Sequence, residues 1–150
     1  MTKPFTLQPL LELMQNRADE ASKELGRRIA AEQDTKAKLN MLIQYRDEYA
    51  ERFRQASAQG LSPAGWRNFQ EFIGRIDEAI AQQRVVVLTS EQHTAAGQAE
   101  WLAHHHKLKA IDTLAERHLA AELQREMKQD QKQQDEFSAR KARSDQSDAA

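Results

Sequence analysis

The sequence has few of the residues that interrupt regular structure or carry reactive chemistry. Its 150 residues include no cysteine, 3 prolines, 5 glycines and an aromatic share of 6%. Without cysteine the chain can form no disulfide and has no thiolate nucleophile or ligand, and a reducing compartment is permitted. Few prolines and glycines mean few turns. No segment approaches the roughly 18 consecutive apolar residues of a membrane span.

An excess of charge of one sign is missing as well. The 22 basic residues balance 23 acidic ones, for a net charge of -1. This balance gives no reason to expect nucleic acid or an anionic membrane as the main partner. Met1–Leu13 lacks the apolar core of a secretion signal, so we expect a cytoplasmic protein. What is abundant is Ala, Glu, Gln, Lys, Arg and Leu, which favour helix and predict an all-α chain of a few long helices.

One break divides the chain before its C-terminal tail. Gly60 can end a helix in a left-handed conformation, Ser62 can cap the next helix, and Pro63 suits its first position. We therefore expect one domain over 1–138, with a helix over about 6–58, a turn over about 59–62 and a helix over about 63–138. Residues 139–150 have no apolar stripe and are expected to be frayed or disordered.

The first predicted helix carries a seven-residue repeat. Ten of the fourteen positions in its two heptad series are apolar or aromatic, which is typical of a coiled-coil seam. The series are Leu11, Ala18, Leu25, Glu32, Leu39, Arg46 and Phe53, and Met14, Ala21, Arg28, Thr35, Leu42, Tyr49 and Ala56. Because the polar members Arg28, Glu32 and Thr35 cluster, we expect the seam to loosen there.

The second predicted helix has a matching but patchier stripe. It consists of Ile73, Ile80, Val87, Thr94, Trp101, Leu108 and Ala115, and of Phe69, Ile76, Gln83, Ser90, Gly97, His104 and Ile111. A short connection forces two such helices to run antiparallel. The run Val85–Leu88 has strand propensity, but a lone strand has no partner, so we interpret it as helix. The expected fold is an antiparallel two-helix coiled coil, a long α-hairpin.

Two groups of residues could suggest enzyme or metal chemistry. Successive helix residues point about 100° apart, so His104, His105 and His106 cannot converge on one ion, and we expect solvent-facing histidines. Carboxylate pairs such as Asp47–Glu48 are frequent, but general acid–base catalysis needs a cleft that shifts a pKa. We therefore expect no enzyme activity, no metal and no cofactor, and interpret these pairs as a solvated charged face.

Apolar residues exceed what one seam can bury. Tyr45 lies beside the seam of the first helix, and Phe72, Ala79 and Val86 form a second stripe on the other. Exposed apolar patches and aromatic side chains are typical of partner surfaces. The alternative is that local crowding simply broadens the core.

Several segments resemble the flagellar FliJ family. Leu39–Tyr49 is similar to the signature of that family's first helix, and Trp66–Ile73 to the start of its second. Asp130–Phe137 resembles its C-terminal Asp-Glu-Phe segment, and the short N-terminal leader, from Leu10–Leu11 onward, also fits. The resemblance covers nearly the whole chain. It implies an antiparallel coiled coil similar to the central stalk subunit of rotary ATP synthases.

The resemblance also implies a role and partners. FliJ-like proteins belong to the flagellar type III export apparatus, on the cytoplasmic face of the inner membrane. They contact the hexameric export ATPase FliI, its regulator FliH and the export gate protein FlhA, and they escort emptied chaperones of late substrates. The ATPase contact would fall on Leu10–Leu25 and Leu119–Phe137.

A gate-binding patch carries over from the same motifs. The implied positions are Leu42, Tyr45, Tyr49, Phe72, Ile76 and Ala79, with Lys38 and Gln83 where the family usually has glutamine and histidine. The alternatives are the equivalent stalk of a virulence-type injection system, a coiled-coil chaperone without an ATPase, and a metal-dependent enzyme.

Overall fold

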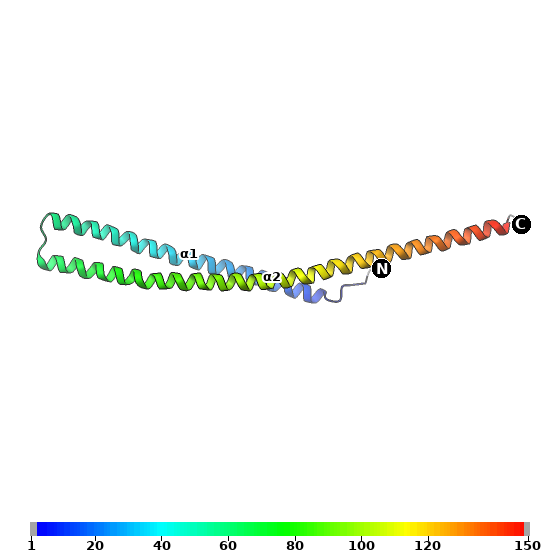
Figure 1. Cartoon of the computed structure of the whole chain (residues 1–150), viewed down its shortest axis with the longest axis horizontal. Helices are drawn as coiled ribbons and strands as arrows, with labels where there is room; N and C mark the ends of the chain where they lie inside the picture. The colour runs from blue at the N-terminus through cyan, green and yellow to red at the C-terminus, as the bar shows by residue number, and fades with distance from the viewer. Residues whose placement is uncertain (1–2, 149–150) are drawn as a thin grey trace. The chain divides into compact units, whose positions relative to one another are not determined.

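A computed structural model describes residues 3–148. Its two helices are α1, Gln8–Ala58, and α2, Pro63–Asp148 (Figure 1). No strand occurs within these described residues, and the run Val85–Leu88 is helical. The described residues separate into two compact units, which we call the hairpin unit (residues 19–103) and the terminal unit (residues 3–18 and 104–148). The expected all-α fold of two packed helices is confirmed.

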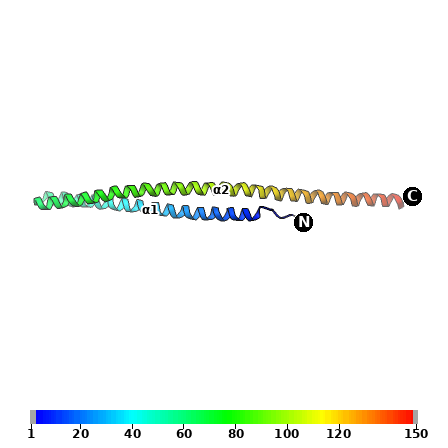
Figure 2. The same ribbon diagram turned by 90° about the horizontal axis from the view of Figure 1, so that it is seen from below.

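In the hairpin unit α1 and α2 lie side by side and run antiparallel (Figures 1 and 2). The contacts show that the helices are antiparallel, because residues with lower numbers on α1 contact residues with higher numbers on α2. Phe53 contacts Trp66 with ring centroids 6.4 Å apart, Arg46 bonds Asp77, and the Arg28 carbonyl accepts from Thr94.

The connection between the helices lies at residues 59–62. Gly60 has a φ of 95°, the left-handed conformation in which glycine pays no Cβ penalty, and its N–H donates to the Ser57 carbonyl at 3.2 Å. The Ser62 hydroxyl then accepts the N–H of Gly65 at 3.1 Å and caps α2. Pro63 takes the first helical position, where its missing N–H costs nothing.

The heptad positions form the interface between α1 and α2. All fourteen seam positions of α1, and all fourteen of α2, are buried or half-buried. Among the described residues, the apolar side chains with the least exposure are Ala18, Ile76, Ile80 and Val87. Most seam residues keep some exposure, because each packs against a single neighbouring helix. The seven-residue spacing therefore identified the side of each helix that faces the other.

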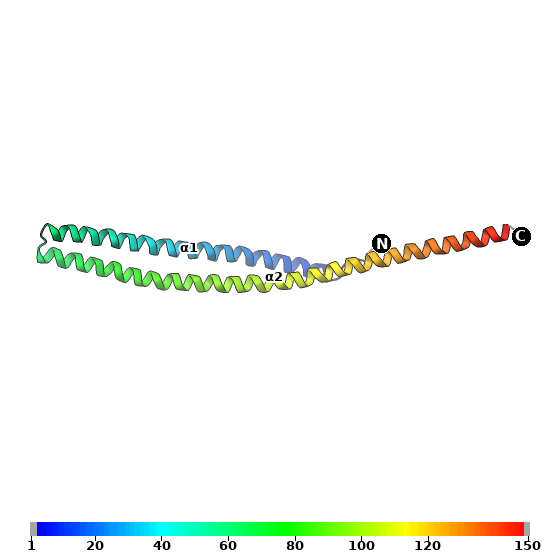
Figure 3. The same cartoon turned by 45° about the horizontal axis from the view of Figure 1, so that its top comes forward.

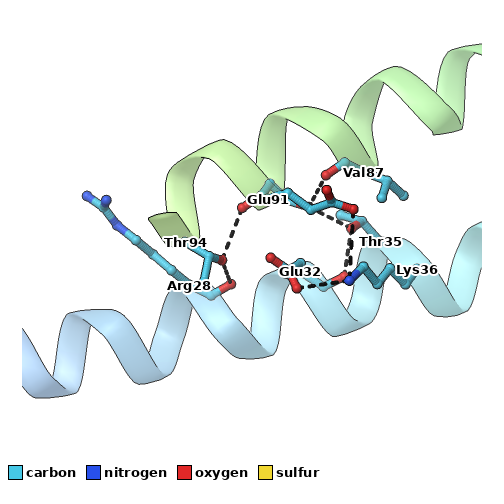
Figure 4. Close-up of polar contacts among 8 residues, drawn as sticks. Arg28, Glu32, Thr35, Lys36, Val87, Glu91 and Thr94 are labelled. Carbon is cyan, nitrogen blue, oxygen red and sulfur yellow. Dashed lines mark hydrogen bonds and ion pairs between the residues drawn. The ribbon is translucent and has the colours of Figure 1, made fainter. Parts of the chain in front are cut away.

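The polar part of the seam is held by hydrogen bonds between the helices (Figure 4). The hydroxyls of Thr35 and Ser90 lie 2.9 Å apart, and Gln83 Nε2 donates to the Thr35 carbonyl at 3.0 Å. The guanidinium of Arg28 donates to the His93 carbonyl at 2.8 Å. A Cβ at Gly97 would lie 2.9 Å from Cδ of Arg28, so a larger residue there would make the Arg28 side chain shift. Cross-helix hydrogen bonds thus link the two sides of the seam at this point, and its expected loosening stays a prediction.

In the terminal unit the leader, residues 3–7, contacts α2 through hydrogen bonds and a ring contact; Figure 3 shows α1 and α2 continuing into this unit. The backbone N–H of Lys3 donates to Glu122 Oε2 at 3.3 Å, and the Lys3 carbonyl lies 3.0 Å from Nε2 of His118. The ring of Phe5 lies 5.4 Å from that of His118. Glu122 is only 4% exposed and also pairs with Arg125. The leader thereby shields a carboxylate on α2.

The C-terminal segment differs from the expectation. α2 continues through 139–148 as an exposed helix, where the sequence predicts a frayed or disordered tail; residues 149–150 lie outside the described part. The segment lacks proline and glycine, and alanine, lysine, arginine and glutamine favour helix, so nothing local ends α2 earlier. At the other end α1 begins at Gln8 rather than near residue 6.

The seam predicts a difference in stability between an inner and an outer position of α2. Ile80→Ala should lower the free energy of unfolding by about 2–4 kcal/mol, because it removes a buried side chain and leaves a cavity. The matched Val86→Ala, at a position 46% exposed, should change it by less than about 0.5 kcal/mol. Urea denaturation followed by circular dichroism measures both, and equal losses would contradict the seam.

Candidate partner-binding surface

A cluster of aromatic rings joins α1 and α2 near the turn. Tyr49 is central to it, with ring centroids 4.2 Å from Phe72 and 5.2 Å from Phe69. Phe53 continues the cluster, 5.3 Å from Phe69. Tyr45 lies at its edge, 6.2 Å from Phe72 in an edge-to-face arrangement. Pairs of this geometry stabilise by about 0.5–1.5 kcal/mol beyond burial, so the cluster gives Tyr45 a firm support.

An open hollow of about 540 Å³ lies beside this cluster. Its lining comes mainly from α1 and consists of Lys38, Met41, Leu42, Gln44, Tyr45, Glu48 and, from α2, Gln83. The walls are largely apolar, and Lys38 and Glu48 supply charge of opposite sign. A hollow of this kind can accept an apolar side chain of a partner, with polar groups at its rim.

The structure brings the eight predicted patch residues to one region of the hairpin unit. Lys38 and Tyr45 are exposed, and Tyr45 keeps 46% of its surface. Five are half-buried: Leu42, Tyr49, Phe72, Ala79 and Gln83. Ile76 is only 6% exposed, so it supports the surface from below and offers little area to a partner. The alternative explanation, that these apolar residues only broaden the core, fits the buried Ile76 but not the exposed Tyr45.

Three lining residues were missed in the sequence. Met41, Gln44 and Glu48 belong to the hollow, and Met41 is 69% exposed. A signal was present, because Met41, Tyr45 and Glu48 follow the spacing of three and four that aligns residues on one helix face. Without knowing where α2 lies, that spacing does not separate a hollow from an ordinary exposed face.

An ion pair spans the two helices close to the aromatic cluster. The guanidinium of Arg46 donates from Nε and Nη2 to both carboxylate oxygens of Asp77. These hydrogen bonds hold the pKa of Asp77 below its usual value and raise the pKa of Arg46. Arg46 occupies a seam position, so the pair replaces an apolar contact there. We expect the pair mainly to fix how the helices face each other, since an exposed ion pair adds little stability.

The three consecutive histidines differ partly from the expectation. His106 is exposed, but His104 and His105 are half-buried. His104 is a seam position, which explains its burial, and its Nδ1 has no hydrogen-bond partner among residues 3–148. Within residues 3–148 no three His, Cys, Asp or Glu side chains are grouped so that they could hold a metal ion. In the same part of the chain, no helix is long and apolar enough to cross a membrane.

Comparison with known proteins decides the family. The family model described as flagellar FliJ protein matches residues 2–147. The chain is 32% identical to the flagellar FliJ protein of Salmonella typhi over 142 residues, which cover 95% of this chain and 97% of that protein. It is 31% identical to the flagellar FliJ protein of Escherichia coli K12, with the same coverage. The chain belongs to the flagellar FliJ protein family.

A solved structure has the same fold as this FliJ-family chain. It is that of a YscO homologue, CT670, from Chlamydia trachomatis. The two superpose with a TM-score of 0.65 at 18% identity, and the match covers 91% of this chain and 93% of the other. At this identity the likeness concerns the fold alone.

The aromatic cluster predicts different roles for the two tyrosines of the FliJ-family chain. Tyr49→Ala should lower the free energy of unfolding by about 2–4 kcal/mol, because it removes the ring packed on Phe69 and Phe72. Tyr49→Phe keeps that ring and should cost less than about 1 kcal/mol. Tyr45→Ala should cost clearly less than Tyr49→Ala. Guanidinium denaturation compares the three variants, and equal losses for the two alanine variants would refute the supporting role of Tyr49.

Proposed function

We propose that this FliJ-family chain is a non-enzymatic component of the flagellar type III export apparatus. In this proposal it couples the export ATPase FliI, with its regulator FliH, to the export gate protein FlhA, and it escorts late-substrate chaperones. It would work in the cytoplasm, at the cytoplasmic face of the inner membrane. The relatives at 31–32% identity are flagellar proteins, which supports this reading over a virulence-type stalk.

The observation that carries the gate assignment is the hollow beside Tyr45. An aromatic side chain with half its surface free, firmly supported and next to an apolar depression, is the usual form of an interface anchor. Most of the positions that the family resemblance implies line this hollow or support it. We assign the gate contact to Lys38, Leu42, Tyr45, Tyr49, Phe72, Ile76, Ala79 and Gln83.

We assign the ATPase contact to the segments Leu10–Leu25 and Leu119–Phe137. In the terminal unit, α2 presents several large apolar side chains that are at least half exposed. They are Leu119, Leu123, Met127 and Phe137. The first three follow one another at intervals of four, so they share one face of α2. Such a face can press on another protein without any catalytic group.

The gate proposal predicts a selective loss of affinity. Tyr45→Ala should weaken binding of the full chain to purified gate protein by at least about 10-fold, because it removes the exposed anchor. Met41→Ala should weaken it less, since Met41 is only one part of the wall. Leu119→Ala is the matched control, at a similarly exposed position in the terminal unit, and should bind as the wild type does.

Isothermal titration calorimetry measures these affinities, and circular dichroism checks that each variant keeps its helices. An unchanged affinity for Tyr45→Ala would remove the hollow from the gate contact. An equal loss for Leu119→Ala would show that the effect is not local.

A further inference from the structure

One outward face of α2 in the hairpin unit is unusually poor in charge. Over residues 79–103, the Asp, Glu, Lys and Arg side chains are only Arg84, Glu91 and Glu100, although such residues make up 30% of the whole chain. The side of a helix that faces water is normally its charged side. Here much of that side is instead alanine, valine, leucine, glutamine and threonine.

Within this face runs a second heptad stripe, which we call the back stripe. Its members are Ala81, Val85, Leu88, Gln92, Ala95, Ala99 and Leu102, at alternating intervals of four and three residues. All seven are exposed, with Val85 at 64% and Leu88 at 56%. At 100° per residue the stripe lies about 150° around α2 from the seam. It therefore belongs neither to the packing of α1 on α2 nor to the hollow beside Tyr45.

The intervals indicate what would cover the back stripe. Alternation of four and three is the pattern by which one helix packs along another in a coiled coil. The alanines at 81, 95 and 99 would allow the second helix to approach closely. A strand or an irregular loop would not match a repeat of this length, so the fitting occupant is another helix.

The stripe is complementary to a second copy of itself in antiparallel orientation. In an antiparallel pair of helices, opposed residues have numbers with a constant sum, which we call the layer sum. In the hairpin unit the layer sum is 122, as for Arg28 and Thr94. If two back stripes pair in the same a-to-d manner with their midpoint level with residue 90, the numbers of opposed residues sum to 180. This pairing places Val85 on Ala95 of the second copy, Leu88 on Gln92 and Ala81 on Ala99. Val85 on Ala95 and Leu88 on Gln92 set a large side chain against a small or flexible one, and two alanines meet in the third layer. At each end of the stripe, Leu102 falls opposite Glu78 of the second copy.

The flanking charges favour the same arrangement. Tyr45 and Phe72 show which residues meet beside a seam, because they lie next to the hairpin seam and their ring centroids are 6.2 Å apart. Their numbers sum to 117, which is five below the layer sum. The equivalent flanking pair for a layer sum of 180 is Arg84 with Glu91 of the second copy, formed twice by symmetry. The two Glu91 side chains come near each other, but each also has Lys36 of its own chain at 3.9 Å.

We infer that the back stripe joins two copies of this chain, back to back and antiparallel, through the α2 segments 81–102. This inference goes beyond the proposed export role and does not depend on it, because its test needs no export component.

Sedimentation velocity of the full chain tests the dimer. The wild type should self-associate below about 100 μM, as expected for a small but complementary interface. Leu88→Glu should raise the dissociation constant at least about 100-fold, because it places a charge in an apolar interface. Leu119→Glu, at a position equally exposed but outside the stripe, should behave as the wild type. A wild type that stays monomeric would overturn the inference and leave the stripe to a helix of another protein.

A charge exchange tests the flanking pair without touching the apolar stripe. Arg84→Glu should weaken the dimer, since both of its attractions become repulsions. Combining it with Glu91→Arg should restore most of the affinity, because the pairs re-form with reversed sign. If the double variant is no tighter than Arg84→Glu alone, the proposed register is wrong.

The absence of native cysteine permits a direct test of orientation. A mixture of Val85→Cys and Ala95→Cys chains should oxidise mainly to the mixed disulfide, because the antiparallel register opposes these positions. A parallel dimer would instead favour disulfides between two Leu88→Cys chains, and that result would overturn the antiparallel arrangement. Circular dichroism confirms that each variant remains helical.

Discussion

The seven-residue spacing along α1 and α2 determines which side chains of one helix lie opposite which side chains of the other. In the hairpin unit each helix has a single neighbour, so the seam is the only place where apolar side chains can leave water within the fold. Every other apolar residue must stay at least partly exposed. The partner-binding surface and the back stripe both follow from this constraint. Tyr45, Phe72, Ala79 and the back stripe lie outside the seam, and seam residues such as Leu42 and Tyr49 complete the partner-binding surface.

The polar part of the seam fixes the alignment of α2 along α1, although it provides less apolar contact than the rest of the seam. Thr35 bonds Ser90, and Gln83 bonds the Thr35 carbonyl. Sliding α2 by one heptad would break these bonds and leave their groups unpaired, which typically costs more than a lost apolar contact. Polar residues in coiled-coil seams often select one alignment in this way. With α2 held in that alignment, Phe72 reaches Tyr45 and Tyr49, and Gln83 reaches the hollow near Leu42.

Much of this was accessible from the sequence, because helix periodicity and turn chemistry are local. The heptad positions, the turn around Gly60 and the apolar surplus at Tyr45 all rest on residues a few positions apart. The misses are non-local. That Met41 lines a hollow depends on where α2 lies. The contact of Lys3 with Glu122 joins residues that are more than a hundred positions apart in the sequence. The burial of His104 is an exception, since the heptad already placed it in the seam.

The register of the seam can be measured directly with cysteines at Thr35 and Ser90, whose hydroxyl oxygens lie 2.9 Å apart. Thr35→Cys combined with Ser90→Cys should form an intramolecular disulfide on mild oxidation, seen as faster migration of a monomer on a non-reducing gel. Leu42→Cys combined with Ser90→Cys, displaced by one heptad, should not. Efficient closure of the displaced pair, or failure of the first, would contradict the alignment that assembles the partner-binding surface.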